Sequence, residues 1–220
     1  MSTSSFTLRY FNVPGLSETI RLLLTAAKVE WTEEHPEWPQ EKPNQPFGRL
    51  PVLLQKGADS EADLVLSESV TIERYLARTY GFLPADPRKA ALQEQIRDRL
   101  TDIILAFFIQ LSASAEKKEE LVNKFESLLS KQIEVSSQAL RDNGNNGHFF
   151  GSELTYVDIA SYAFYKYLIV SGKEYQASVS ELVKSSLTPE LRKHISVVEA
   201  DPLLEAQVAK HDTLVSVLSA

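Results

Sequence analysis

Several side chains near the start of the chain are of types that can bind a charged ligand. Tyr10 ends a short alternating stretch, and a phenol can donate a hydrogen bond to an anion. Trp38 and Lys42 carry N–H groups that donate and cannot accept. Ser69, after Glu68, opens a predicted helix whose first N–H groups attract an anion. Each also has an ordinary alternative: a half-buried strand tyrosine, a partly buried tryptophan, a solvated lysine and a plain helix cap.

Composition excludes several other chemistries. The chain has no cysteine among its 220 residues, so disulfides, thiolate metal sites and cysteine nucleophiles are excluded. The histidines are far apart at positions 35, 148, 194 and 211, so no metal site is expected. A formal net charge of −7 without a basic stripe argues against nucleic-acid binding. No apolar run is long enough to cross a membrane, and the N-terminus lacks a signal-peptide pattern, so we expect a cytoplasmic protein.

The elements that must position these residues form an α/β pattern over residues 1–83. Strands are expected near 6–10, 29–35, 52–55 and 64–66, and helices over 20–27 and 69–80. The segment 38–47 carries three prolines and is expected to be irregular or a short helix. The order β-α-β and then β-β-α predicts an α/β domain.

Strand patterns nearly vanish beyond this point. We predict a linker over 84–90 and an all-helical domain over 91–220. The first long helix is indicated by apolar residues at helical spacing, namely Ile96, Leu100, Ile103, Phe107 and Leu111. Thr155 and Asp158 match a helix-capping box in front of an apolar helix, which supports the fold and not the chemistry.

Four segments, in this order, resemble those of the cytosolic glutathione transferases. They are Tyr10-Phe11-Asn12, Trp38-Pro39-x-x-Lys42, Phe47-Gly48-Arg49-Leu50-Pro51-Val52-Leu53 and Glu68-Ser69-x-x-Ile72-x-Arg74-Tyr75-Leu76. They are most similar to the sigma-like class, which includes the haematopoietic prostaglandin D synthases. The resemblance implies a thioredoxin-like half that binds glutathione as co-substrate, with no other cofactor, followed by an all-α half. It also implies a homodimer, for which Phe47 matches a subunit-docking aromatic in some classes.

The resemblance implies a role for each side chain of the site. The Tyr10 hydroxyl would donate to the glutathione sulfur and so favour the thiolate. Lowering a thiol pKa from ~8.5 to ~6.5 requires roughly 2.7 kcal/mol of differential stabilisation. Trp38 and Lys42 would bind the glycine carboxylate. Ser69 would hold the γ-glutamyl carboxylate, and Glu68 the γ-glutamyl ammonium.

Two further implications concern the backbone and the second substrate. In the family the Leu50–Pro51 bond is cis, and the main chain of Leu50 pairs with the cysteine of glutathione like an added strand; a strand-opening trans proline is the alternative. A site between the domains would take a small hydrophobic electrophile. Its candidate residues are Phe11, Phe107, Phe108 and Leu111, with Val215 and Leu218 near the C-terminus, although such apolar stripes are also typical of a core.

One departure from the sigma-like pattern bears on activity. Leu16 stands where those relatives carry an arginine that tunes the thiolate or orders the tyrosine loop. Its loss puts strong thiol activation in question, and prostaglandin synthase activity in particular. Arg21 lies further along the predicted helix, which argues against its acting as a substitute.

These observations support one function and leave two alternatives. The first is a glutathione S-transferase for detoxification, in which the thiolate attacks an electrophile. The second is a non-catalytic carrier or structural protein like the S-crystallins. The third is an interaction module like the transferase-like domain of elongation factor 1 gamma. Conjugation, peroxide reduction and isomerisation all use the same thiolate, so the reaction type stays open.

Overall fold

A computed structural model describes residues 5–57, 62–175 and 177–210 of the chain. The described residues group into two compact units, 5–83 together with 202–210, and 84–201. The segment 202–210 therefore groups with the first unit. The division into domains with a linker over 84–90 stays a prediction.

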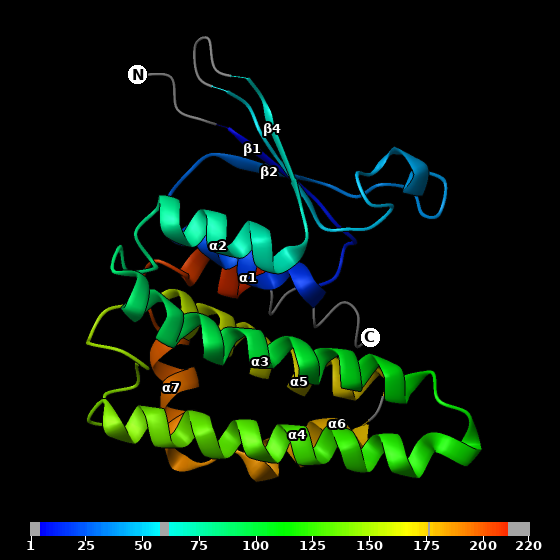
Figure 1. Ribbon diagram of the computed structural model, residues 1–220, viewed down its shortest axis with the longest axis vertical. Helices are drawn as coiled ribbons and strands as arrows, with labels where there is room; N and C mark the ends of the chain where they lie inside the picture. Colours follow the sequence, from blue (N-terminus) through cyan, green and yellow to red (C-terminus); the bar gives the residue numbers. More distant parts are fainter. Residues whose placement is uncertain (1–4, 58–61, 176, 211–220) are drawn as a thin grey trace. The chain divides into compact units, whose positions relative to one another are not determined.

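The first unit is built on a four-stranded sheet with the order β2-β1-β3-β4 (Figure 1). The strands are β1 (Phe6–Arg9), β2 (Trp31–Glu34), β3 (Val52–Gln55) and β4 (Leu64–Ser67). β1 is parallel to β2 and antiparallel to β3, which is antiparallel to β4. A parallel pair needs a crossover connection, which α1 (Glu18–Ala26) supplies. The predicted thioredoxin-like fold is confirmed.

Helices cover one face of this sheet (Figure 1). α1 packs against α2 (Ser69–Thr79), and α2 contacts β4. Phe6 and Leu8 of β1 are buried, as the alternation predicted, and so are Leu22, Leu23 and Leu24 of α1. The proline-rich segment contains only a short 3₁₀ turn, η2 (Lys42–Asn44).

The second unit is helical throughout its described secondary structure. Its helices are α3 (Pro87–Leu111), α4 (Ala115–Asp142), α5 (Tyr156–Tyr175), α6 (Ala177–Ser186) and α7 (Pro189–Glu199). α3 and α4 lie side by side (Figure 1). α3 begins at Pro87, inside the expected linker, because the Asp86 carboxylate caps it by accepting from the Arg88 and Lys89 N–H groups. Over the described residues, no helix combines the length and apolarity that a membrane span requires.

A buried carboxylate organises the start of α5. Asp158 accepts hydrogen bonds from the Thr155 N–H at 2.9 Å, the Thr155 hydroxyl at 2.6 Å and the Phe149 N–H at 2.8 Å. The predicted capping role of these residues is therefore confirmed. Two histidines also approach the carboxylate, His148 with Nδ1 at 3.6 Å and His194 with Nδ1 at 3.9 Å.

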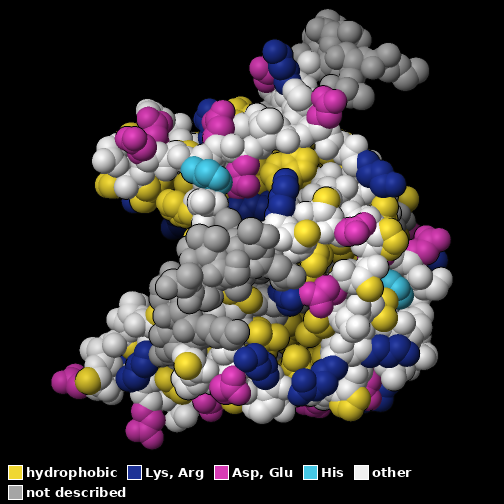
Figure 2. Space-filling view, turned by 180° about the vertical axis from the view of Figure 1, so that it is seen from behind, with side chains coloured by type: hydrophobic (Ala, Val, Ile, Leu, Met, Phe, Trp, Pro, Cys, Tyr) yellow, Lys and Arg dark blue, Asp and Glu magenta, His cyan; other side chains and the backbone are white. Residues whose placement is uncertain are grey.

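The face of the molecule turned away in Figure 1 is shown in Figure 2. Acidic, basic and apolar side chains are interspersed over its described part.

Candidate functional site

The strand register brings three separate parts of the sequence to one end of the sheet. Arg9, the last residue of β1, pairs with Val52, the first of β3. Val52 pairs in turn with Ser67, the last residue of β4. The residues one step beyond these positions are Tyr10, Pro51 and Glu68. Three of the predicted site segments therefore meet at the same sheet end.

Tyr10 is held by hydrogen bonds on both its backbone and its side chain. Its N–H donates to the Glu34 carbonyl at 3.1 Å, and its carbonyl accepts from His35 Nδ1 at 2.9 Å. The ring is only 6% exposed, and the hydroxyl accepts from the Leu16 N–H at 3.0 Å. The backbone that delivers this N–H turns at Gly15, with φ of +46°, and a Cβ there would lie 2.6 Å from the Tyr10 hydroxyl.

Burial raises the pKa of the Tyr10 phenol above its ordinary value of 10.0. The Leu16 N–H and the charge of Arg21 lower that pKa by smaller amounts. The hydroxyl is therefore protonated at neutral pH. Because its oxygen already accepts from Leu16, its proton is free to be donated to an anion.

Arg21 orders the loop that follows Tyr10, which the sequence argument did not foresee. Its Nη1 donates to the carbonyls of Val13 and Pro14, each at 3.0 Å, and its Nη2 donates to the Phe11 carbonyl at 3.3 Å. Its Cζ lies 5.8 Å from the centroid of the Tyr10 ring. Arg21 thus reaches back from α1 to the loop, although it does not occupy the position of Leu16.

Trp38 and Lys42 stand on the proline-rich segment after β2. The Trp38 ring is half-buried and meets Phe11 edge-on, at 5.6 Å between centroids. Phe11 in turn meets Tyr10 at 5.3 Å. Lys42 is exposed, and its stem runs past Gly48, where a Cβ would lie 3.6 Å from Lys42 Cε. Tyr10, Phe11 and Trp38 are therefore joined in one aromatic row.

The backbone is unusual at three of the predicted site positions. The Leu50–Pro51 bond is cis, as predicted, and so is the Trp38–Pro39 bond, which was not predicted. Glu68 precedes α2 with φ of +71°, a conformation that a residue other than glycine adopts rarely. Its side chain makes no capping hydrogen bond. Ser69 is the first residue of α2 and is partly exposed.

The expected electrophile residues differ in exposure. Phe11 and Phe108 are 37% and 42% exposed. Phe107 is fully buried, and its ring contacts Phe125 and Tyr167 inside the helical unit. Leu111 is partly exposed. Val215 and Leu218 lie outside the described residues.

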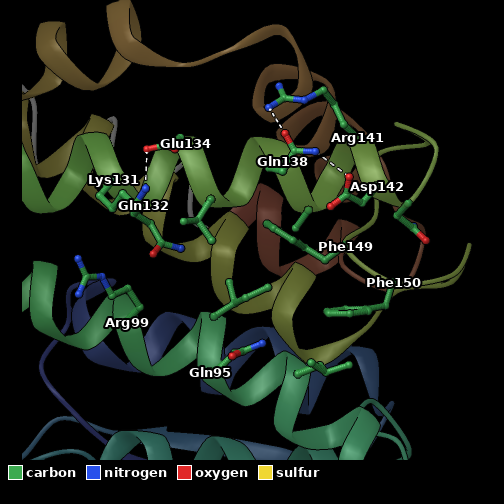
Figure 3. Close-up of a pocket in the computed structure, with 15 residues that line it drawn as sticks. Gln95, Arg99, Lys131, Gln132, Glu134, Gln138, Arg141, Asp142, Phe149 and Phe150 are labelled. Atoms are coloured by element: carbon green, nitrogen blue, oxygen red, sulfur yellow. Dashed lines mark hydrogen bonds and ion pairs between the residues drawn. The ribbon is translucent and has the colours of Figure 1, made fainter.

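A separate cavity of about 970 Å³ opens between α3 and α4 of the helical unit (Figure 3). Leu92 and Ile96 line it from α3, Val135 lines it from α4, and Phe149 and Phe150 complete the wall. Figure 3 shows polar side chains around its rim, where Lys131 pairs with Glu134 and Gln138 bonds to Asp142 and Arg141. Sequence reasoning did not single out this cavity.

Comparisons with known proteins match both units. The model of the glutathione S-transferase N-terminal domain matches residues 6–78, and that of the C-terminal domain matches residues 100–211. Glutathione S-transferase 3 of Caenorhabditis elegans is 31% identical over 70% of this chain and 75% of its own. The hematopoietic prostaglandin D synthase of Gallus gallus is 30% identical over 70% of this chain and 74% of its own. The solved sigma class GST of Fasciola hepatica has a TM-score of 0.77 at 24% identity, over 96% of this chain and 98% of its own, a likeness of fold.

Proposed function

The chain belongs to the glutathione S-transferase family, and from that premise we propose that Tyr10 is its catalytic residue. The observation that carries the proposal is the buried, protonated Tyr10 hydroxyl, which accepts from the Leu16 N–H and keeps its own proton to donate. That proton would bond to the sulfur of bound glutathione and favour the thiolate.

The remaining site residues would hold the ends of the tripeptide. The exposed Lys42 ammonium and the Trp38 indole suit the glycine carboxylate. Glu68, whose side chain makes no capping bond, suits the γ-glutamyl ammonium, and Ser69 at the start of α2 suits the γ-glutamyl carboxylate. Leu50, before Pro51, would pair through its main chain with the cysteine. The strand register supports this set, because it gathers three of the segments at one sheet end.

The reaction follows from the stabilised thiolate. The sulfur attacks a small hydrophobic electrophile, a carbon–sulfur bond forms, and the bond to the leaving group breaks with its electron pair. Positioning and electrostatic stabilisation of the sulfur supply the rate, and no cofactor besides glutathione takes part. The exposed rings of Phe11 and Phe108 are the proposed contacts of the electrophile, together with Leu111. We place this activity in cytoplasmic detoxification.

We further propose that the chain forms a homodimer and that each copy supplies both halves of the contact. Phe47 is 69% exposed, the most exposed of the large apolar side chains that the structure describes. The cavity between α3 and α4 has apolar walls at Leu92, Ile96 and Val135 and is large enough for an aromatic ring. We therefore propose a two-fold dimer in which Phe47 of each copy enters this cavity of the other.

The experiment that tests the function is a pH titration of the ultraviolet thiolate absorbance of bound glutathione. It is run on the wild type, on Tyr10→Phe and on Tyr80→Phe as a matched control from the same unit. We expect a thiolate pKa well below that of free glutathione in the wild type and the control, and a return towards it in Tyr10→Phe. Binding with an unshifted thiol would indicate a carrier or an S-crystallin-like protein. Absence of binding would overturn the proposal.

A further inference from the structure

We propose that Arg21 is the positioning residue for Tyr10 and that Gln207, through Glu18, fixes Arg21 in place. This inference rests on the proposed function of Tyr10 and adds to it a relay from the segment 202–210 to the catalytic loop. The relay lies wholly within the first unit.

Arg21 fixes the loop that follows Tyr10. The backbone leaves Tyr10 and must return within six residues so that the Leu16 N–H meets the Tyr10 hydroxyl. Three carbonyls along that path, of Phe11, Val13 and Pro14, accept from the Arg21 guanidinium at 3.0 to 3.3 Å. The guanidinium is rigid and planar. Because it donates to three carbonyls at once, it fixes the course of the loop better than separate flexible donors would.

The carboxylates of Glu33 and Glu18 hold the Arg21 guanidinium in place. Arg21 is buried, and its Nε donates to the Glu33 carboxylate at 3.0 and 3.2 Å. Its Nη1 donates to Glu18 Oε2 at 3.1 Å, and its Nη2 also bonds to Glu33. The partners Glu18, Glu33 and the loop carbonyls thus surround the guanidinium. Removal of one carboxylate would leave a buried charge incompletely paired.

Arg21 acts on Tyr10 mainly through geometry, because its charge lowers the pKa of Tyr10 by less than the Leu16 N–H does. One guanidinium and two carboxylates give the group a formal charge of −1. Arg21 therefore brings little uncompensated positive charge to the site. Hydrogen bonds and charges of Glu33 and Glu18 outweigh the effect of burial and raise the pKa of Arg21, which keeps all its donors protonated.

The segment 202–210 contacts Glu18 through Gln207. Gln207 lies in the helical stretch 205–210 and is buried. Its Nε2 donates to Glu18 Oε1 at 3.1 Å, across 189 positions of sequence. Glu18 therefore accepts a hydrogen bond from Gln207 at Oε1 and one from Arg21 at Oε2. Gln207 holds the carboxylate in the orientation that Arg21 needs.

The test compares Arg21→Lys, Arg21→Gln and Gln207→Leu with the wild type. Gln93→Leu, which removes a buried glutamine of α3, is the control for the loss of a buried amide. The readouts are the thiolate pKa of bound glutathione, and kcat and KM for conjugation of 1-chloro-2,4-dinitrobenzene. Because the pKa is read on protein that binds glutathione, it reports on folded molecules only.

If Arg21 positions Tyr10, the thiolate pKa rises in both Arg21 variants and kcat falls about tenfold or more, while KM for glutathione changes less. Gln207→Leu shows a smaller change in the same direction, about threefold in kcat, and Gln93→Leu shows none. If Arg21→Gln does not fold, the thiolate pKa and kcat of Arg21→Lys and Gln207→Leu still test the inference.

Folded variants with a lowered melting temperature but an unchanged thiolate pKa and kcat would make Arg21 a structural residue and overturn the inference. A thiolate pKa that rises in Arg21→Lys but stays at the wild-type value in Gln207→Leu would overturn the relay through Glu18. A wild type that binds glutathione without a lowered pKa would instead overturn the proposed function, and this inference with it.

Discussion

The Leu16 N–H donates a hydrogen bond of 3.0 Å to the hydroxyl of Tyr10. A backbone donor does not depend on the side chain at its position, so leucine in place of an arginine leaves this contact intact. The contact does depend on the turn at Gly15, whose φ of +46° is easy only for glycine.

Gly15→Ala should impair thiolate stabilisation beyond its effect on folding. A left-handed alanine costs roughly 1–2 kcal/mol of stability. The new Cβ would also lie 2.6 Å from the Tyr10 hydroxyl and would displace it. Because small displacements of a catalytic group are costly, we expect kcat/KM to fall about tenfold or more and the thiolate pKa to rise.

Gly81→Ala is the matched control for this change. Gly81 lies in the same unit with φ of +80°, and a Cβ there would meet nothing within 4 Å. It should lose a similar amount of stability in urea unfolding and keep its activity. Equal losses of activity in the two alanine variants would contradict the prediction.

Lys42→Met should weaken glutathione binding with little effect on turnover. Lys42 is exposed, so its contact with a carboxylate is screened and worth about 1 kcal/mol, or about fivefold in affinity. We expect KM for glutathione to rise by that factor with kcat unchanged, because the contact is the same in ground and transition states. Lys56→Met, an exposed lysine elsewhere in the unit, is the control. An equal fall in kcat would instead assign Lys42 to the chemical step.

The parts of the fold that follow local rules were predictable from the sequence. Alternation at Phe6 and Leu8 indicated β1, and helical spacing indicated α1 and α2. The cis bond before Pro51 was predicted because the surrounding residues match a family segment, and the structure has it. Local period and motif were sufficient in each case.

The contacts of Arg21 and Gln207 were not predictable in the same way. Position along a helix suggested that Arg21 was too far from Tyr10, but the loop folds back to meet the long side chain. Nothing local to Gln207 indicates a contact with Glu18, because chain topology alone brings them together. Similarly, Phe107 and Phe108 are both apolar on one helix. Both rings lie near Tyr167, but only Phe107 also packs against Phe125, and it is buried while Phe108 is exposed.

His148→Gln and His194→Gln should change stability with opposite dependence on pH. The nearby Asp158 carboxylate, 3.6 Å from Nδ1, is the main cause that raises the pKa of His148, and burial lowers the pKa of His194. Charged His148 therefore stabilises the fold fully below its ordinary pKa of 6.5, and that contribution is lost as pH rises through the higher folded-state value. Neutral His194 contributes above its ordinary pKa, and its contribution is lost as pH falls.

Urea unfolding at acidic and alkaline pH measures both effects. The stability deficit of His148→Gln relative to the wild type should be larger at acidic pH than at alkaline pH. The deficit of His194→Gln should be larger at alkaline pH. Deficits that do not change with pH would contradict both pKa shifts, the one that Asp158 causes at His148 and the one that burial causes at His194.

Phe47→Ala should weaken the proposed dimer. Phe47 is 69% exposed on one copy, and a buried aromatic at an interface is commonly worth about 2 kcal/mol or more, which is roughly thirtyfold in the dimer dissociation constant. Sedimentation equilibrium of the wild type and the variant measures this change. Val135→Glu should have a similar effect, because it places a charge on the apolar wall of the cavity between α3 and α4.

A mixture of the two variants separates this contact from any other mode of dimerisation. In a two-fold dimer the Phe47→Ala copy keeps an intact cavity, and the Val135→Glu copy keeps an intact Phe47. A mixed pair therefore regains one of the two contacts that each variant alone has lost. Native mass spectrometry of the mixture should show heterodimers in excess over both homodimers. A mixture no more dimeric than its components would mean that Phe47 does not enter this cavity, even if each substitution alone reduces dimerisation.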